Sequence, residues 1–93
     1  MAELEIKLMQ NPDKSRFLRV RLASSLKPGL IAQTDIAYQG TERRTEQAVF
    51  AAGGALAEYL GERYGEFIDC DDVAKQARET FRELILEANQ RLH

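Results

Sequence analysis

AVFAAGGALAEYLGERYG, residues 48–65, has apolar residues at helical spacing but three glycines in its interior. Gly53, Gly54 and Gly61 should each cost a helix about 1 kcal/mol relative to alanine. At about 100° per residue, Gly53, Ala57 and Gly61 nevertheless fall in one row, with larger apolar side chains beside it. We therefore predict a helix with one face nearly stripped of side chains, against which another backbone can pack closely.

Three interpretations of this small-residue face stay open. In the first, the chain's own second helix or its sheet lies against this face. In the second, the face forms a homodimer seam or receives a partner's helix. The third interpretation is a break at Gly53 and Gly54 that leaves two shorter helices. In the homodimer interpretation the self-association surface comprises Phe50, Gly53, Gly54, Ala57 and Gly61. These glycines form no phosphate-binding loop, because the G-x-x-x-x-G-K-[ST] pattern is missing.

Capping residues define this helix and a second one. Thr41 suits the N-cap of a helix over about residues 42–63, and Gly65 suits a left-handed C-cap. Asp69 is placed to cap the second helix, with further acidic residues in its first turn. An apolar stripe about 120° wide follows along that helix. The stripe contains Val73, Ala77, Phe81, Leu84, Ile85, Ala88 and Leu92.

Three earlier segments, residues 3–10, 16–23 and 30–39, alternate between apolar and polar residues. Period two indicates strands with one buried and one solvated face. The links NPDKS and SSLKPGL are short and carry turn residues, so the strands should form an antiparallel meander. We therefore expect a single α+β domain, residues 1–93, with a three-stranded antiparallel meander followed by two α-helices packed on one sheet face (β-β-β-α-α).

Two registers of the first hairpin keep its apolar residues on one face. One places Glu5 opposite Arg19 and Glu3 opposite Arg21. The other places Glu5 opposite Arg21 but sets Lys7 opposite Arg19. Cross-strand charge pairing favours the first register by a few tenths of a kcal/mol, which is too little to choose between them.

The outer face of the expected sheet combines basic and large apolar side chains. We predict Met9, Phe17, Arg19 and Arg21 as partner-binding residues. A protein partner would engage Met9 and Phe17, whereas a single-stranded nucleic acid would use the arginines and stack on Phe17. Acidic residues on the same face are expected to pair with the arginines. Ile31 and Leu86 also fall outside the expected core.

Arg43 and Arg44 follow Glu42 at the start of the first helix. Cations at a helix N-terminus oppose the macrodipole, so both arginines are slightly unfavourable for stability there. One interpretation is a solvated helix start that pairs with Glu42 and Glu46. The other is a contact with a phosphate or carboxylate group.

Catalytic and metal-binding patterns are not evident. His93, the only histidine, is the last residue, so a histidine-based triad or general base on a fixed element is not expected. Cys70 lies among aspartates that oppose thiolate formation. The acidic segment 66–72 lacks the spacing of a calcium loop and is explained by helix capping. We predict no catalytic residue, no metal and no cofactor, and therefore no enzyme.

Composition indicates a soluble intracellular protein. The net charge of −2 argues against attachment to nucleic acid by bulk charge. A single cysteine fits a reducing, cytoplasmic setting, and no signal peptide or membrane-spanning segment is expected. We predict a small non-enzymatic binding or accessory protein that acts through protein–protein contacts. Self-association as a homodimer is one expectation, and a role as an inhibitor encoded by a mobile element is another. The alternative is a nucleic-acid-binding protein that uses the basic outer sheet face.

Overall fold

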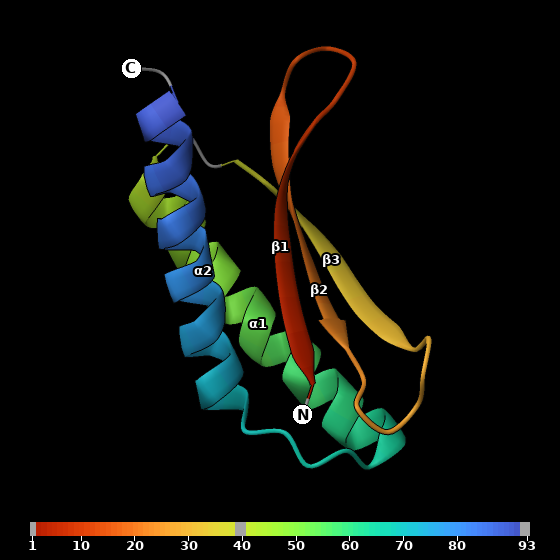
Figure 1. The fold of residues 1–93 in the computed structure, drawn as a ribbon. Coiled ribbons are helices and arrows are strands. Elements are labelled where there is room, and N and C mark those ends of the chain that lie inside the picture. The colour runs from red at the N-terminus through yellow and green to blue at the C-terminus, as the bar shows by residue number, and fades with distance from the viewer. Residues whose placement is uncertain (1, 39–40, 92–93) are drawn as a thin grey trace.

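The computed structural model describes residues 2–38 and 41–91 and has the expected order of elements. The strands are β1 (Glu3–Gln10), β2 (Arg16–Ala23) and β3 (Ile31–Ala37), and the helices are α1 (Glu42–Tyr64) and α2 (Cys70–Arg91), as Figure 1 shows. The α+β prediction is confirmed. The third strand is shorter than expected at both ends; Gln39, at its expected end, and Leu92 and His93 lie outside the described residues.

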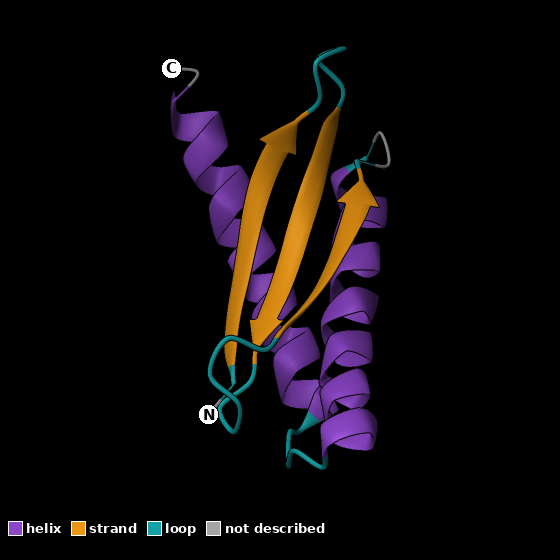
Figure 2. Ribbon diagram, turned by 90° about the vertical axis from the view of Figure 1, so that its right-hand side faces the viewer, coloured by secondary structure: helices purple, strands orange, loops and turns teal. Residues whose placement is uncertain are grey.

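The molecule has two layers, with both helices on one face of the sheet (Figure 2). The strand order is β1-β2-β3 and both pairs are antiparallel. Helix α1 contacts β2 and β3, whereas α2 contacts β1 and α1. The long axis measures 43 Å, about twice the shortest axis of 20 Å. Neither α1 nor α2 lies over the other face of the sheet (Figure 2).

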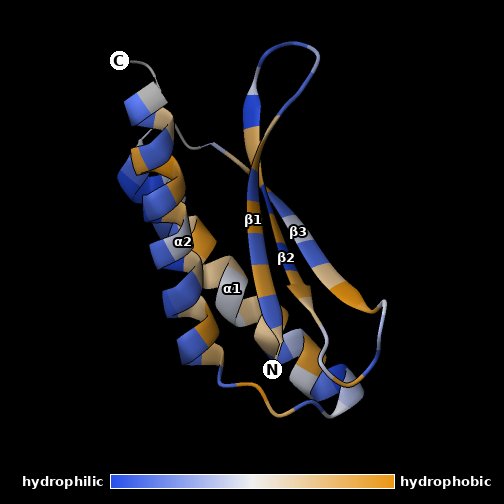
Figure 3. Cartoon of the chain, viewed as in Figure 1, coloured by the Kyte–Doolittle hydropathy of each residue, from blue (hydrophilic) through white to orange (hydrophobic). Residues whose placement is uncertain are grey.

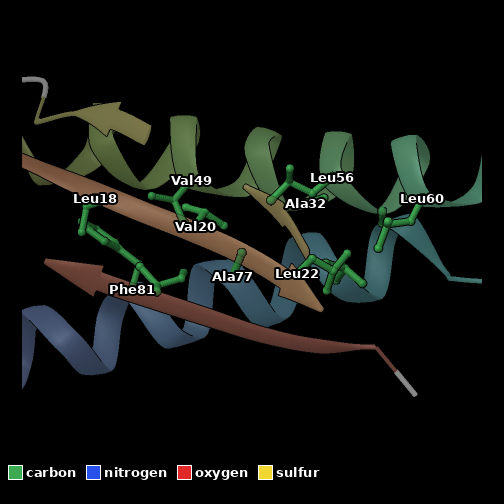
Figure 4. Close-up of a cluster of buried hydrophobic side chains, with 12 residues drawn as sticks. Leu18, Val20, Leu22, Ala32, Val49, Leu56, Leu60, Ala77 and Phe81 are labelled. Carbon is green, nitrogen blue, oxygen red and sulfur yellow. The ribbon is translucent and has the colours of Figure 1, made fainter. Parts of the chain in front are cut away.

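The core lies between these layers and contains the alternating apolar residues of the strands (Figure 4). Leu18, Val20 and Leu22 of β2 are fully buried, as expected for the central strand of a sheet with one face packed on a helical layer. Phe81 is the largest fully buried side chain and comes from the predicted stripe of α2. The other fully buried apolar residues are Val49, Ala57, Leu60 and Ala77.

The hairpin register is the one with Glu5 opposite Arg21 and Lys7 opposite Arg19. The register favoured by charge pairing was therefore wrong. Arg19 binds Asp35 on its other side, in β3, with 3.0 Å between Nε and Oδ1. Asp35 offsets the repulsion between Arg19 and Lys7. A comparison restricted to the first two strands does not include Asp35.

The turn between β1 and β2 is consistent with the same register. Asn11 N donates to the Ser15 carbonyl at 2.8 Å, and Lys14 N donates to the Asn11 carbonyl at 2.9 Å. Lys14 adopts a positive φ of 73°, and the Asp13 carboxylate accepts from Ser15 N at 2.9 Å. This closed five-residue loop places Gln10 opposite Arg16 and so determines the pairing that follows.

The predicted helix caps are all present. Arg44 N donates to Thr41 Oγ1 at 3.2 Å, and Asp69 Oδ1 accepts from the backbone N–H groups of Asp71 and Asp72 at 3.0 and 3.2 Å. Gly65 has the left-handed conformation, with φ 68° and ψ 22°. These caps satisfy backbone groups that the helix ends would otherwise leave unpaired.

Helix α2 of the same chain lies against the small-residue face of α1. A Cβ placed on Gly53 would lie 2.8 Å from Ala77 Cβ and 3.1 Å from the Val73 carbonyl oxygen. Only a residue without a side chain permits this approach, which explains Gly53. Helix α1 continues without a break through Gly53 and Gly54. Of the three interpretations, the structure therefore shows intramolecular packing at Gly53.

Candidate functional site

The outer sheet face brings the four predicted partner-binding residues together. Met9 pairs with Phe17 across the hairpin, and Arg19 and Arg21 follow Phe17 at alternate positions of β2. Met9 and Phe17 are half-buried, and the Arg19 guanidinium lies 5.5 Å from the centre of the Phe17 ring. The face thus has an apolar end next to a charged centre.

The arginines of this face are paired with carboxylates. Arg19 makes two hydrogen bonds to Asp35, at 3.0 and 3.2 Å, and these raise the pKa of the Arg19 side chain above its ordinary value. Arg21 Nη1 lies 3.9 Å from Glu5 Oε1, and Lys7 Nζ lies 3.5 Å from the same oxygen. With Glu3 also on this face, three carboxylates face three cations. This balance removes the free positive charge that phosphate binding requires.

The five predicted self-association residues are divided between two environments. Gly53 and Ala57 are buried inside the chain, so a second copy cannot reach them without displacing α2. Gly54 and Gly61 are half-buried; a Cβ on Gly54 would lie 3.8 Å from α2, and one on Gly61 would lie 3.3 Å from the Glu66 carbonyl oxygen. Phe50 is half-buried and lies under Arg78, whose guanidinium carbon is 5.2 Å from the ring centre.

Sequence reasoning missed an apolar surface at the end of the molecule where α1 finishes. Tyr59 and Tyr64 meet edge to face with 6.1 Å between ring centres, and Lys27 Nζ lies 5.6 Å from the centre of the Tyr64 ring. Figure 3 shows hydrophobic colour at the start of β3 and in the linker between the helices, both at this end. The exposed large apolar residues gathered here are Leu26, Ile31, Tyr59, Tyr64 and Phe67.

A hollow of about 450 Å³ lies between β3 and α1 at the edge of this surface. We call it the β3–α1 groove. Helix α1 contributes the small residues Ala52 and Ala55, which leave space beside the strand. The remaining lining residues are Ile31, Ala32, Gln33, Thr34, Leu56 and Tyr59.

Glu66 is the buried carboxylate of the described chain. Its oxygens accept from Ser25 Oγ at 2.6 Å, Ser25 N at 2.7 Å and Ser24 Oγ at 2.8 Å. The Ser25 hydroxyl and then the Ser25 N–H lower the pKa of Glu66 below its ordinary value, and they outweigh the opposite effect of burial. The carboxylate is fully engaged in joining the helix linker to the β2–β3 loop, so we assign it a structural role.

Potential metal ligands do not cluster within residues 2–38 and 41–91. No three histidine, cysteine, aspartate or glutamate side chains there are grouped as metal ligands would be. Cys70 is half-buried, with its Sγ 4.0 Å from the Ile68 carbonyl oxygen. His93 lies outside the described residues. In the same part of the chain, neither α1 nor α2 has the length of apolar sequence that crossing a bilayer requires.

Comparison with protein-family models, with curated proteins and with solved structures gives no match. Function therefore has to be inferred from the surfaces of the molecule itself.

Proposed function

We propose that this domain binds another protein by accepting an extended segment of the partner alongside β3, with an apolar side chain of that segment in the β3–α1 groove. The observation that carries the proposal is an edge strand with little charge protection beside an apolar hollow. Such a mode combines backbone pairing, which gives affinity, with a side-chain pocket, which gives specificity. It suits a small accessory subunit or inhibitor better than a catalyst.

The edge of β3 differs from the edge of β1. Exposed edge strands pair readily with other chains, and charged side chains are a common protection against such pairing. Strand β1 carries Glu3, Glu5 and Lys7 on its outer face. In β3 the sole charged residue is Asp35, and Arg19 of the neighbouring strand holds it. This difference in charge supports β3 as the edge that a partner would use.

The β3–α1 groove supplies a position for an anchoring side chain. An added strand would present alternate side chains toward the helices, in the direction that Ala32 and Thr34 already take. Ala52 and Ala55 on α1 leave room at that point, and Tyr59 also lines the groove. Tyrosine is frequent at protein interfaces because its ring adds apolar area while its hydroxyl remains solvated.

The proposal is tested with extended peptides selected from a random display library on the purified domain. The best peptide is synthesised and titrated against two variants of α1, Ala55→Glu and Ala51→Glu. Both alanines are exposed, but only Ala55 lines the groove. We expect Ala55→Glu to weaken binding by roughly tenfold or more, and Ala51→Glu to match the parent. Amide exchange in β3 should slow when the peptide binds.

Three results would overturn the proposal. The first is a peptide that binds both variants equally. The second is binding that leaves β3 amide exchange unchanged. The third is a domain that is dimeric on its own and becomes monomeric with Ala55→Glu, because the occupant of the edge would then be a second copy.

We further propose that the outer sheet face makes a second contact with the same partner. Met9 and Phe17 provide its apolar part, and Arg19 and Arg21 provide polar contacts at its centre. We also propose a cytoplasmic location, because a single cysteine fits a reducing compartment. A nucleic-acid role has less support, since the arginines of this face are already paired.

A further inference from the structure

A second hollow, of about 470 Å³, lies between the two helices, and no residue of the sheet lines it. We call it the arginine groove. It shares no lining residue with the β3–α1 groove. Its lining residues are Arg43, Glu46, Gln47 and Phe50 of α1 with Arg78 and Arg82 of α2.

The arginine groove carries more positive charge than its own carboxylate can balance. Arg82 Nη2 lies 2.7 Å from Glu46 Oε1, so this pair is neutral. Within the described residues, neither Arg43 nor Arg78 has a carboxylate at ion-pair distance. Three arginines and one glutamate leave a net charge of +2. Arg43 also lies in the first turn of α1, where the helix dipole adds positive potential.

Arg78 is stacked on an aromatic ring, and its Nε has no hydrogen-bond partner among residues 2–38 and 41–91. Its guanidinium lies over Phe50, at 5.2 Å from the ring centre, and its Nε is buried without a partner in the structure. A buried N–H without an acceptor is destabilising. A guanidinium already fixed by stacking loses little freedom when it binds an oxyanion.

We propose that the arginine groove binds a small organic molecule that carries one phosphate group. A phosphate monoester has a charge of about −1.5 to −2 at neutral pH, which matches the unbalanced charge of the groove. The volume of the groove lies in the range of small-molecule sites and exceeds the needs of a free phosphate ion. Arg43 and Arg78 bind the phosphate oxygens, and the organic part lies against Phe50 beside Gln47.

The test uses phenyl phosphate as the probe in a titration followed by backbone amide NMR of the full chain. Phenol lacks the phosphate, and benzoate replaces it with a carboxylate of lower charge. We expect saturable shifts at the arginine groove with phenyl phosphate, weaker binding of benzoate and no binding of phenol. Arg43→Gln and Arg78→Gln should each weaken phenyl phosphate binding by roughly ten- to a hundredfold.

Arg63→Gln is the matched control, because Arg63 is exposed in the last turn of α1 and outside the groove. Circular dichroism shows whether Arg78→Gln still folds; if it does not, exposed Arg43 decides the test alone. If Arg63→Gln weakens phenyl phosphate binding as much as Arg43→Gln does, the probe is held by the overall charge of the protein and the proposed site is wrong. Equal binding of benzoate would overturn the assignment to phosphate. The proposal is also wrong if phenyl phosphate shows no saturable binding. It is equally wrong if the protein is a dimer that Arg43→Gln dissociates, because a second copy would then occupy the groove.

Discussion

Gly53 shows how closely the two helices approach at a single residue. A methyl group there would lie 2.8 Å from the methyl group of Ala77, a separation that packed carbon atoms do not adopt without movement. Gly54, the next residue, has its nearest neighbours at 3.8 Å, which is ordinary contact. Two adjacent glycines of one helix thus have opposite steric environments.

We therefore predict opposite effects of two alanine substitutions. Gly53→Ala should lower the free energy of unfolding by about 1–3 kcal/mol, because overpacking outweighs the gain in helix propensity. Gly54→Ala should raise it by up to about 1 kcal/mol, because the propensity gain has no steric opposition. Urea denaturation of the parent and both variants measures the two changes. Equal stabilisation by both substitutions would contradict the close approach at Gly53.

Residue-scale patterns explain how much of the molecule could be predicted from the sequence. The caps at Thr41, Asp69 and Gly65 depend on neighbouring residues alone, so they were predicted correctly. The stacking of Arg78 on Phe50 was missed, since it joins side chains of two different helices. The sequence did mark Arg43 as unfavourable for its helix, and this was the available signal for the arginine groove.

The elements of this fold are delimited by short connections that use glycine at two left-handed positions. Gly29 has a φ of 85° in the turn that leads into β3, where Leu30 N donates to the Lys27 carbonyl at 3.1 Å. Gly65 has a φ of 68° at the end of α1, and its N–H donates to the Gly61 carbonyl at 3.0 Å. A side chain on either glycine would have free space but an unfavourable backbone conformation.

At the element scale we predict that Gly65→Ala destabilises the protein by about 1–2 kcal/mol, through backbone conformation alone. Gly65→Asn should lose clearly less stability, because asparagine tolerates the left-handed region better than alanine does. Thermal unfolding of the two variants gives the comparison. An alanine variant as stable as the asparagine variant would show that the helix ends in another way.

Element boundaries, buried faces and topology were predicted well, whereas the hairpin register and the hollows between elements were not. Alternation in β1 and β2 identified their buried faces because side-chain direction follows directly from the backbone period. The register of the first hairpin follows the closed turn of residues 11–15, which a comparison of cross-strand charges leaves out. The β3–α1 groove arises from Ala52 and Ala55 next to Thr34, a neighbourhood that forms only when the helix folds back on the sheet.

At the scale of the whole molecule, Glu66 joins the strand half to the helix half. Its carboxylate connects the helix linker to Ser24 and Ser25 after β2, across more than forty residues of sequence. Hydrogen bonds to the ionised form lower the pKa of Glu66 in the folded protein. The unfolded chain has the ordinary glutamate pKa of about 4.3. The contribution of this carboxylate to stability is therefore fully present above that value and is lost as pH falls through the lower folded pKa.

We predict that Glu66→Gln destabilises the protein at neutral pH and that the difference from the parent shrinks as pH falls below about 4. Exposed Glu58 on α1 provides the control, because Glu58→Gln should leave stability near that of the parent throughout. Urea denaturation at a series of pH values measures the difference. A constant difference from pH 7 to pH 3 would show that the Glu66 hydrogen bonds do not depend on its charge.

The ends of the described chain lie at opposite ends of the molecule, as Figure 1 shows for the start of β1 and the finish of α2. A mechanical force applied at Ala2 and Arg91 would therefore act along the 43 Å axis and pull β1 and α2 in opposite directions. The β1–β2 hydrogen bonds run across that direction, so they carry the load together rather than one after another. Under tension this small domain should resist extension until the β1–β2 pairing yields in one step.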